Sequence, residues 1–515
     1  MSINPLAQRR SFLAVLSTLP WVGSTWAQGM MSNNMSAMQG MGGMAGMMHG
    51  AAASTALAPV QAIAAGAPLA ELKKLVNTSI QPGQFRATLR AAPVSAAVMQ
   101  DGTHTVFWAY NDSLPGPLIE VMEGDTVEIE FINDLPQPST IHWHGLPVPA
   151  EQDGNPHDAV PAGGRRWYRF TLPPDCAGTY WYHPHPHELT AEQVFRGLAG
   201  LFIVRAKNDP LKDIPERHLV FSDLKLAADG SIAPNDMNDE MNGREGQFAL
   251  VNAQRQPLLN FAAGGRERWR IWNANSARYL KLKLPGARFT LVGTDGGLLQ
   301  KPVPGLTELV MAAAERIEVI VDAPQGAARV GLVTEPVERG KMGMVPQEHA
   351  ITLLEVDFSA VKPDQLAALP QLPQALRRIE PLGTVQAKKR VVFSESMSMA
   401  GGVHSMKFLV NGKSFDMKRV DFTSKINEVE LWEIANESDM DHPFHIHGIQ
   451  FQVIERERDG KVIPEPLLAW RDMVNTQSGE TVRIKLVQRH KGLRMFHCHI
   501  LEHENAGMMG QVLVD

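Results

Sequence analysis

The stretch YNDSLPGPLIEVMEGDTVEIEFIND, residues 110–134, has a plan that occurs twice more along the chain. It consists of an Asn-led turn, a strand, a charged or glycine turn, a second strand and a closing Asn. The related segments are VNAQRQPLLNFAAGGRERWRIWNAN at residues 251–275 and VNGKSFDMKRVDFTSKINEVELWEIANES at residues 410–438. The leading asparagines, Asn111, Asn252 and Asn411, are 141 and 159 residues apart. Each interval is the size of one β-sandwich domain, so the repeat predicts three similar domains.

Short alternating segments separated by Gly, Pro, Asn and Asp indicate an all-β protein from about residue 80 onward. Apolar and polar side chains alternate over residues 126–132, 269–271 and 428–432. We expect β-sandwich domains over residues 80–208, 215–355 and 385–515. A Pro-rich linker would span residues 356–384, and its clearest helical segment runs from Asp364 to Arg378.

The composition excludes several classes of protein. The 515 residues include 49 Lys and Arg against 55 Asp and Glu, a net charge of −6, with no long charge run, so nucleic acid is not an expected partner. Beyond the N-terminus no apolar run reaches the ~20 residues of a membrane span. Two cysteines cannot form a disulfide framework. We therefore expect a protein without a membrane span in its mature form, and a monomer.

The N-terminus has the pattern of an export signal. Arg9 and Arg10 precede Ser11-Phe12-Leu13 and an apolar stretch to about Val22, and small residues lead up to Ala27. A charged start, a short apolar stretch and a small-residue cleavage site are typical of a cleaved signal peptide. The paired arginines resemble the twin-arginine type, which exports folded proteins. We expect a signal peptide over residues 1–27 and a mature protein in the periplasm.

Residues 28–79 begin with a methionine-rich tail. Eight of the 25 methionines lie between residues 29 and 50: Met30, Met31, Met35, Met38, Met41, Met44, Met47 and Met48. The intervening Gly and Ser residues favour disorder. Thioether sulfur is a soft ligand that suits Cu(I), so the tail is a candidate for copper capture; the alternative is a low-complexity linker.

Histidines occur in pairs at a fixed spacing. Five His-x-His instances form four clusters, which contain His142 and His144, then His183, His185 and His187, then His445 and His447 (with His442 just upstream), and finally His497 and His499. On a strand, residues two apart point to the same face, so each pair presents two imidazoles side by side. Four pairs supply eight nitrogens, which are too many for one ion and suit a metal cluster.

The segment FHCHILEHENAGMM, residues 496–509, carries a second and different site. Cys498 lies between His497 and His499, so its side chain points away from theirs. A thiolate, two imidazoles and a weak axial thioether describe a blue-copper electron-transfer centre. His503 and Met508 follow Cys498 at plus five and plus ten, and His442 can arrive from an upstream strand. One strand would then join an electron-accepting centre to a multinuclear one.

The four motifs, their order and their spacing resemble those of the multicopper oxidases, closest to bacterial periplasmic cuprous oxidases and laccase-like enzymes. The resemblance covers nearly the whole mature chain and implies three cupredoxin-like Greek-key β-sandwich domains with four coppers. Type 1 copper would be bound by His442, Cys498, His503 and axial Met508, and type 2 copper by His142 and His445. The type 3 pair would be bound by His144, His183, His185, His447, His497 and His499. The second domain has no such pairs and is expected to be a spacer.

The resemblance also implies residues beyond the copper ligands. Asp153 and Glu504 match positions linked to proton delivery, which dioxygen reduction requires. Met440 matches a ligand position for substrate copper beside the type 1 site, whereas Asp439 is one residue out of register with the acidic ligand of the family. The methionine insertion of the family is reduced to the scattered residues Met342, Met344, Met397, Met399 and Met406, for which core packing is the alternative.

We therefore expect an oxidase that couples one-electron oxidation of a reductant to four-electron reduction of dioxygen to water. The preferred reductant would be Cu(I), with phenols or aromatic amines as further substrates, in a role in copper tolerance. Three alternatives remain: a periplasmic copper-sequestering protein without turnover, a structural relative that has lost copper, and a copper nitrite reductase. The intact set around Cys498 disfavours the first two, and the number of histidine pairs disfavours the third.

Overall fold

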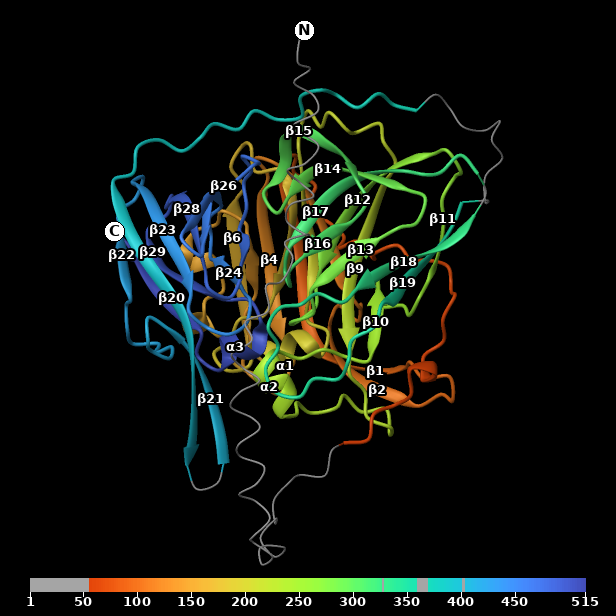
Figure 1. The fold of residues 1–515 in the computed structure, drawn as a ribbon, viewed down its shortest axis with the longest axis horizontal. Coiled ribbons are helices and arrows are strands. Elements are labelled where there is room, and N and C mark those ends of the chain that lie inside the picture. Colours follow the sequence, from red (N-terminus) through yellow and green to blue (C-terminus); the bar gives the residue numbers. More distant parts are fainter. Residues whose placement is uncertain (1–54, 327, 359–368, 401–402) are drawn as a thin grey trace, which may run out of the picture. The chain divides into compact units, whose positions relative to one another are not determined.

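The strands of the protein form six sheets arranged as three pairs (Figure 1). The computed structural model describes residues 55–326, 328–358, 369–400 and 403–515. The expected signal peptide and the methionine-rich stretch lie outside the described residues. Residues Thr55–Asp515 form one unit, to which the following description applies.

The first pair of sheets is the first sandwich. One sheet has the order β2 (His104–Tyr110), β1 (Gln84–Ala97), β4 (Thr126–Asn133) and β6 (Arg165–Thr171). The other has the order β3 (Gly116–Met122), β8 (Gly200–Arg205), β7 (Gly178–His183) and β5 (His142–His144).

The second sandwich has one sheet in the order β10 (Phe248–Val251), β9 (Glu216–Leu224), β12 (Arg266–Asn273), β17 (Arg316–Asp322), β14 (Arg288–Thr294) and β15 (Gly297–Leu306). Its other sheet has the order β11 (Leu258–Asn260), β19 (Ile351–Asp357), β18 (Arg329–Glu335), β13 (Leu280–Lys283) and β16 (Leu309–Met311).

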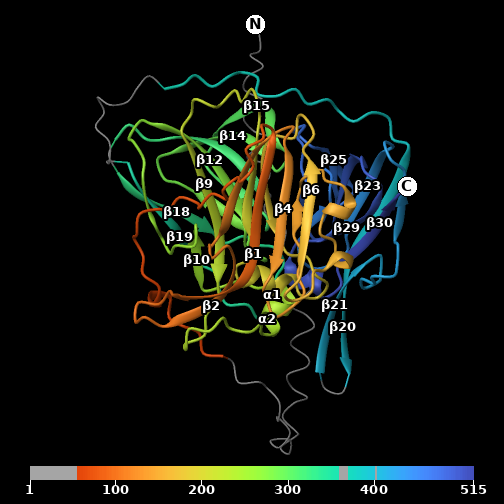
Figure 2. The same cartoon turned by 180° about the vertical axis from the view of Figure 1, so that it is seen from behind.

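The third sandwich has one sheet in the order β21 (Val403–Val410), β20 (Ala387–Ala400), β23 (Val429–Asn436), β28 (Glu480–Val487), β25 (Phe451–Arg458) and β26 (Lys461–Pro464). Its other sheet has the order β22 (Phe422–Ser424), β30 (Met509–Val514), β29 (Gly492–Cys498), β24 (His442–Ile446) and β27 (Met473–Thr476). Figures 1 and 2 both show β20 and β21 projecting beyond the other strands of their sheet.

The three sandwiches share one feature of strand pairing: the first strand of each is parallel to its neighbour, β1 to β4, β9 to β12, and β20 to β23. The leading asparagines of the repeat occupy equivalent places. Asn111, Asn252 and Asn411 have φ angles of 50°, 50° and 51°, a left-handed conformation that Asn tolerates better than most residues. Each accepts a hydrogen bond from one backbone N–H and donates to a carbonyl two residues earlier on the first strand of its unit. The expected all-β fold of three sandwich units is confirmed.

Each sandwich encloses its own core of buried apolar side chains. Along β4 the burial alternates as the sequence predicts. In β12, however, seven of the eight residues are buried, including Arg268 and Arg270. Both arginines pair with Glu318, and Arg270 also donates to Thr179 Oγ1 at 2.7 Å. This polar face of β12 is therefore covered by the first sandwich.

Helices are short and lie near one another (Figures 1 and 2): α1 (Thr190–Phe195), α2 (Met237–Asn242) and α3 (Leu501–Asn505). The part of the chain that the structure describes also contains three 3-10 turns, η1 (Val60–Ala62), η2 (Ala150–Gln152) and η3 (Pro156–Asp158). Among the described residues, no helix has the length and apolar character needed to cross a membrane.

The helix expected over Asp364–Arg378 is wrong for the part that the structure describes. Residues 369–378 contain no helix, and residues 364–368 lie outside the described residues. Pro370 and Pro373 lack the N–H that a helix would use. The segment instead follows β15, where Leu376 N donates to Gln300 O at 2.9 Å.

Candidate copper centres

The first centre brings Cys498 at the end of β29 together with His442 at the start of β24 and His503 in α3. Cys498 Sγ lies 3.4 Å from His442 Nδ1 and 3.9 Å from His503 Nδ1, and the two Nδ1 atoms are 3.3 Å apart. All three residues are fully buried. Bonds of about 2.0–2.3 Å to nitrogen and sulfur in a trigonal site place the donor atoms about 3.5–3.8 Å apart, so this triangle fits one metal ion.

Hydrogen bonds orient both imidazoles of this centre. His442 Nε2 lies 2.8 Å from Ser438 Oγ, and His503 Nε2 lies 3.1 Å from the carbonyl oxygen of Met241 in α2. His503 also stacks on Phe408, with ring centroids 3.7 Å apart. Because Nε2 is occupied in each ring, Nδ1 carries the free lone pair toward Cys498.

Met508 is the fourth residue that the sequence predicts for this centre. It is fully buried in the same apolar core as Cys498, and its carbonyl accepts the Cys498 N–H at 3.0 Å. The Met508 N–H in turn donates to the His503 carbonyl at 2.9 Å. The turn after α3 thus holds the chain segments of all three residues together.

Burial keeps these groups uncharged in the absence of metal. It lowers the pKa of His442 to about 3 and lowers the pKa of His503 well below its ordinary value. Burial also raises the pKa of the Cys498 thiol. A metal ion that takes the thiolate would therefore release a proton on binding.

The second centre is a cluster of eight fully buried histidines, two from each His-x-His pair: His142, His144, His183, His185, His445, His447, His497 and His499. The first four come from β5, the end of β7 and the residues just after β7, and the others come from β24 and β29 and the residue that follows each strand. Their ring nitrogens form three groups that could each hold an ion: His142 with His144 and His445, His144 with His183 and His499, and His185 with His447 and His497. The four motifs, far apart in sequence, therefore meet at one place.

Several of these nitrogens have no hydrogen-bond partner among the described residues, namely His144 Nδ1, His183 Nε2, His185 Nδ1, His447 Nδ1 and both nitrogens of His499. Burial lowers the pKa of His497 to about 3, and burial together with neighbouring imidazoles lowers the pKa of His183, His185 and His499 well below the ordinary value. Neutral, unpartnered imidazoles in a buried cluster are costly unless they bind a metal. The donor set fits several closely spaced copper ions.

Asp153 lies against the cluster as a fully buried carboxylate. Its Oδ1 is 3.1 Å from His142 Nδ1, and its Oδ2 is 3.6 Å from His447 Nδ1. The charge is balanced by Arg494 on β29, whose Nη1 donates to Asp153 Oδ2 at 3.3 Å. Sequence reasoning missed Arg494, because nothing in the neighbouring residues distinguishes a buried arginine from an exposed one.

Glu504 in α3 is the second buried carboxyl group. Its Oε1 lies 3.4 Å from His185 Nε2 and its Oε2 lies 3.2 Å from His497 Nδ1. Burial raises the pKa of Glu504 to about 8. Asp153 and Glu504 therefore contact different histidine pairs of the cluster.

The two residues predicted to bind substrate copper differ in exposure. Met440 is fully buried and Asp439 is exposed. Asp439 N donates to Glu395 Oε1 at 3.2 Å. Their role as ligands stays a prediction.

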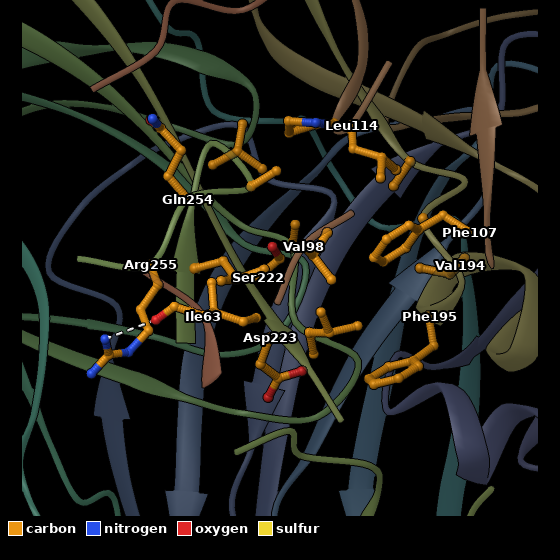
Figure 3. Close-up of a pocket in the computed structure, with 18 of the residues that line it drawn as sticks. Ile63, Val98, Phe107, Leu114, Val194, Phe195, Ser222, Asp223, Gln254 and Arg255 are labelled. Carbon is orange, nitrogen blue, oxygen red and sulfur yellow. Dashed lines mark hydrogen bonds between the residues drawn. The ribbon is translucent and has the colours of Figure 1, made fainter. Parts of the chain in front are cut away.

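A separate cavity of about 300 Å³ lies between the first and second sandwiches (Figure 3). Phe107, Val194 and Phe195 line one side, and Arg255, which donates to Ile63 O at 3.1 Å, lies at another. None of the clustered histidines lines this cavity. It is therefore distinct from both centres.

The fold and these two centres define a multinuclear copper protein built from three β-sandwiches. Three family models described as multicopper oxidase match the chain, over residues 93–209, 218–330 and 388–515. Multicopper oxidase mco of Staphylococcus aureus is 32% identical over 414 residues, which are 79% of this chain and 83% of that protein. A laccase of Bacillus subtilis is 26% identical over 517 residues, covering 86% and 96% of the two chains.

A solved structure described as a multicopper oxidase from Campylobacter jejuni, a metallo-oxidase, superimposes with a TM-score of 0.85 at 42% identity, covering 91% of this chain and 99% of that one. The chain belongs to the multicopper oxidase family. It is an oxidoreductase that uses oxygen, its sandwiches are cupredoxin-like, and it has four coppers of types 1, 2 and 3.

Proposed function

We propose that His442, Cys498, His503 and Met508 would hold type 1 copper. Type 2 copper is held by His142 and His445, whose Nε2 atoms lie 3.3 Å apart. The type 3 pair is held by the two remaining groups of three, His144 with His183 and His499, and His185 with His447 and His497. The observation that carries the proposal is the position of Cys498 in one centre while its neighbours His497 and His499 lie in the other.

When bound, copper would supply one-electron acceptance at the Cys498 centre and, at the histidine cluster, the reduction of dioxygen to water, a reaction that consumes four electrons and four protons. The remaining chemistry belongs to the chain. The Cys498 carbonyl accepts a hydrogen bond from His497 Nδ1 at 2.9 Å, so one residue contacts both centres through different atoms. We infer that Asp153 and Glu504 carry protons to the cluster, at Oδ1 beside His142 and at Oε1 beside His185.

The preferred reductant in this proposal is Cu(I), and small phenols or aromatic amines are further substrates. Support comes from methionines of the second sandwich and of the segment after it. Met241 supplies the carbonyl that orients His503, Met342 packs against the core around Cys498, and Met344 and Met237 are exposed. The exposed thioethers of Met237 and Met344 are soft donors that suit Cu(I), and in this proposal they form a soft-ligand surface for the substrate. The relative from Campylobacter jejuni is described as a metallo-oxidase.

The N-terminal methionines, which lie outside the described residues, would capture Cu(I) for this surface, and Asp439 and Met440 would take part in binding it. A monomer exported to the periplasm by the twin-arginine route, acting in copper tolerance, completes the proposal. Replacement of Arg9 and Arg10 by lysine, followed by cell fractionation, tests the route: export should stop, and unchanged periplasmic enzyme would reject it.

Oxygen uptake on anaerobically prepared Cu(I) tests the function. The proposal expects one O₂ consumed for about four Cu(I) oxidised, with no uptake by a Cys498→Ser variant. A copper-sequestering protein would bind Cu(I) without consuming oxygen, and that result would reject the proposal. Steady-state rates with Cu(I), Mn(II) and a phenol then rank the reductants.

A further inference from the structure

One arginine of the second sandwich contacts all three sandwiches. Arg316, the first residue of β17, is 1% exposed. Its Nε donates to the carbonyl of Thr179 on β7 at 2.9 Å, and its Nη1 donates to Asp472 Oδ1 at 2.6 Å. Nη2 pairs with the other oxygen of Asp472, so the ion pair is bidentate. Asp472 directly precedes β27 in the third sandwich.

Asp472 holds two histidines of the cluster. Its side-chain Oδ1 lies 3.1 Å from His144 Nε2, and its backbone carbonyl lies 2.8 Å from His445 Nδ1. Gly145, which follows His144, has φ +81°, and a Cβ at this position would collide with Asp472 Oδ2. The chain next to His144 is thus built to admit this carboxylate.

These contacts fix which nitrogen of each ring faces the cluster. His144 donates its Nε2–H to the carboxylate, which leaves Nδ1 unpartnered among the described residues. His445 donates its Nδ1–H to the Asp472 carbonyl, which leaves Nε2 directed at His142. A carboxylate that accepts the outer N–H of a ligand histidine sets its tautomer and increases its basicity.

We infer that the Arg316–Asp472 pair positions His144 and His445 for copper, so that the second sandwich is part of the trinuclear site and not only a spacer. Both are positioning residues, and the inference rests on the ligand assignment proposed above. Arg316 fixes the carboxylate in orientation and balances its charge, since an unpaired carboxylate at this depth would be costly. Through Thr179 it also ties Asp472 to β7, the strand that carries His183.

Two variants test the inference. Asp472→Asn keeps the backbone carbonyl for His445 but removes the charge that holds the His144 tautomer. Arg316→Lys keeps a positive charge but loses the bidentate fork and the contact with Thr179. Arg270→Lys is the matched control. Arg270 is equally buried, bonds to Thr179 Oγ1 and pairs with Glu318, but contacts no clustered histidine.

Copper equivalents per chain are measured after dialysis against a series of copper buffers, together with the blue type 1 absorption and the type 2 EPR spectrum. The wild type must bind four equivalents and show the blue colour, which tests the ligand assignment itself. We expect Asp472→Asn and Arg316→Lys to lower the affinity of the histidine cluster for copper about 10–100-fold and to change the type 2 EPR spectrum. The type 1 colour should persist in both, and Arg270→Lys should behave as the wild type.

Full cluster occupancy with an unchanged EPR spectrum in both variants would overturn the inference. So would equal loss of cluster copper in Arg270→Lys, because the effect would then reflect any weakening of the interface. Loss of the type 1 colour together with cluster copper in both variants would overturn it as well, since the pair would then hold the fold and not the cluster.

Discussion

Replacement of Asp153 separates the structural from the chemical role of a buried carboxylate. Asp153 and Arg494 are both fully buried and joined at 3.3 Å. Asp153→Asn leaves the guanidinium charge without its counterion, and removal of one partner of a buried pair costs about 3–5 kcal/mol. Asp153→Asn combined with Arg494→Gln removes both charges and keeps amide groups that can bond to each other. The free energy of unfolding of the double variant should be within about 1 kcal/mol of the wild-type value, because replacing a whole buried pair is often neutral.

Urea unfolding of the apoproteins measures these free energies, and oxygen uptake with Cu(I) and with a phenol measures turnover. If Asp153 carries protons, turnover should fall about 10²–10⁴-fold in the single variant and stay low in the double variant. The type 1 colour should be unchanged in both. Recovery of turnover together with stability in the double variant would refute the reasoning, since Asp153 would then serve only to balance Arg494.

Four further predictions concern other parts of the chain. Cys498→Ser should lower bound copper from about four to about three equivalents and abolish the blue colour and turnover. Metal analysis and absorption spectra measure these changes. Loss of copper from the histidine cluster as well would contradict the separation of the two centres. Deletion of residues 29–50 should slow Cu(I) oxidation at low copper while sparing phenol oxidation, and an equal loss on both would count against a capture role. Asn411→Ala should cost about 2 kcal/mol, because it removes two hydrogen bonds at a left-handed φ, and denaturant unfolding measures the loss. Burial and the nearby Asp472 carboxylate raise the pKa of Asp295 to about 7, so the folded apoprotein retains a proton that the unfolded chain releases near pH 4. The free energy of unfolding should therefore fall as pH rises from about 4 to about 7. Asp295→Asn should make the free energy of unfolding depend less on pH over the same interval.

The features that could be predicted from the sequence are those that depend on residues close together in the chain. In a β-strand, successive side chains point to opposite faces, so Cys498 and its neighbours lie on opposite faces of the β29 segment independently of the rest of the protein. The asparagine repeat likewise reflects a local turn, since each Asn bonds to the first strand of its own unit. Such patterns can be recognised in the sequence because the residues that form the local structure are the same few residues that make up the pattern.

Residues that support the centres from a distance left no comparable signal. Asp472 is 328 residues from His144, and Arg494 is 341 residues from Asp153. A single aspartate or arginine reads as a solvated charge unless its partner is known. The same limit explains Arg268 and Arg270, which alternate with apolar residues as on an exposed face but are covered by the first sandwich. A helix was expected from Asp364 to Arg378, but over residues 369–378 the prolines and the contact along β15 leave none.

The second sandwich illustrates why the absence of ligands in a domain does not make it a passive spacer. It places a carbonyl, that of Met241, on His503 at one centre, and a guanidinium, that of Arg316, on Asp472 at the other. The Met241 carbonyl contacts His503 Nε2, the ring nitrogen on the side away from Cys498. Arg316 contacts the Asp472 carboxylate, which in turn contacts His144 Nε2. Both contacts therefore act on the orientation and tautomer of a histidine ring. Since one sandwich supplies both contacts, a displacement of that sandwich would disturb the Cys498 centre and the histidine cluster together. The geometry of electron acceptance and of oxygen reduction is therefore tied to the same structural unit.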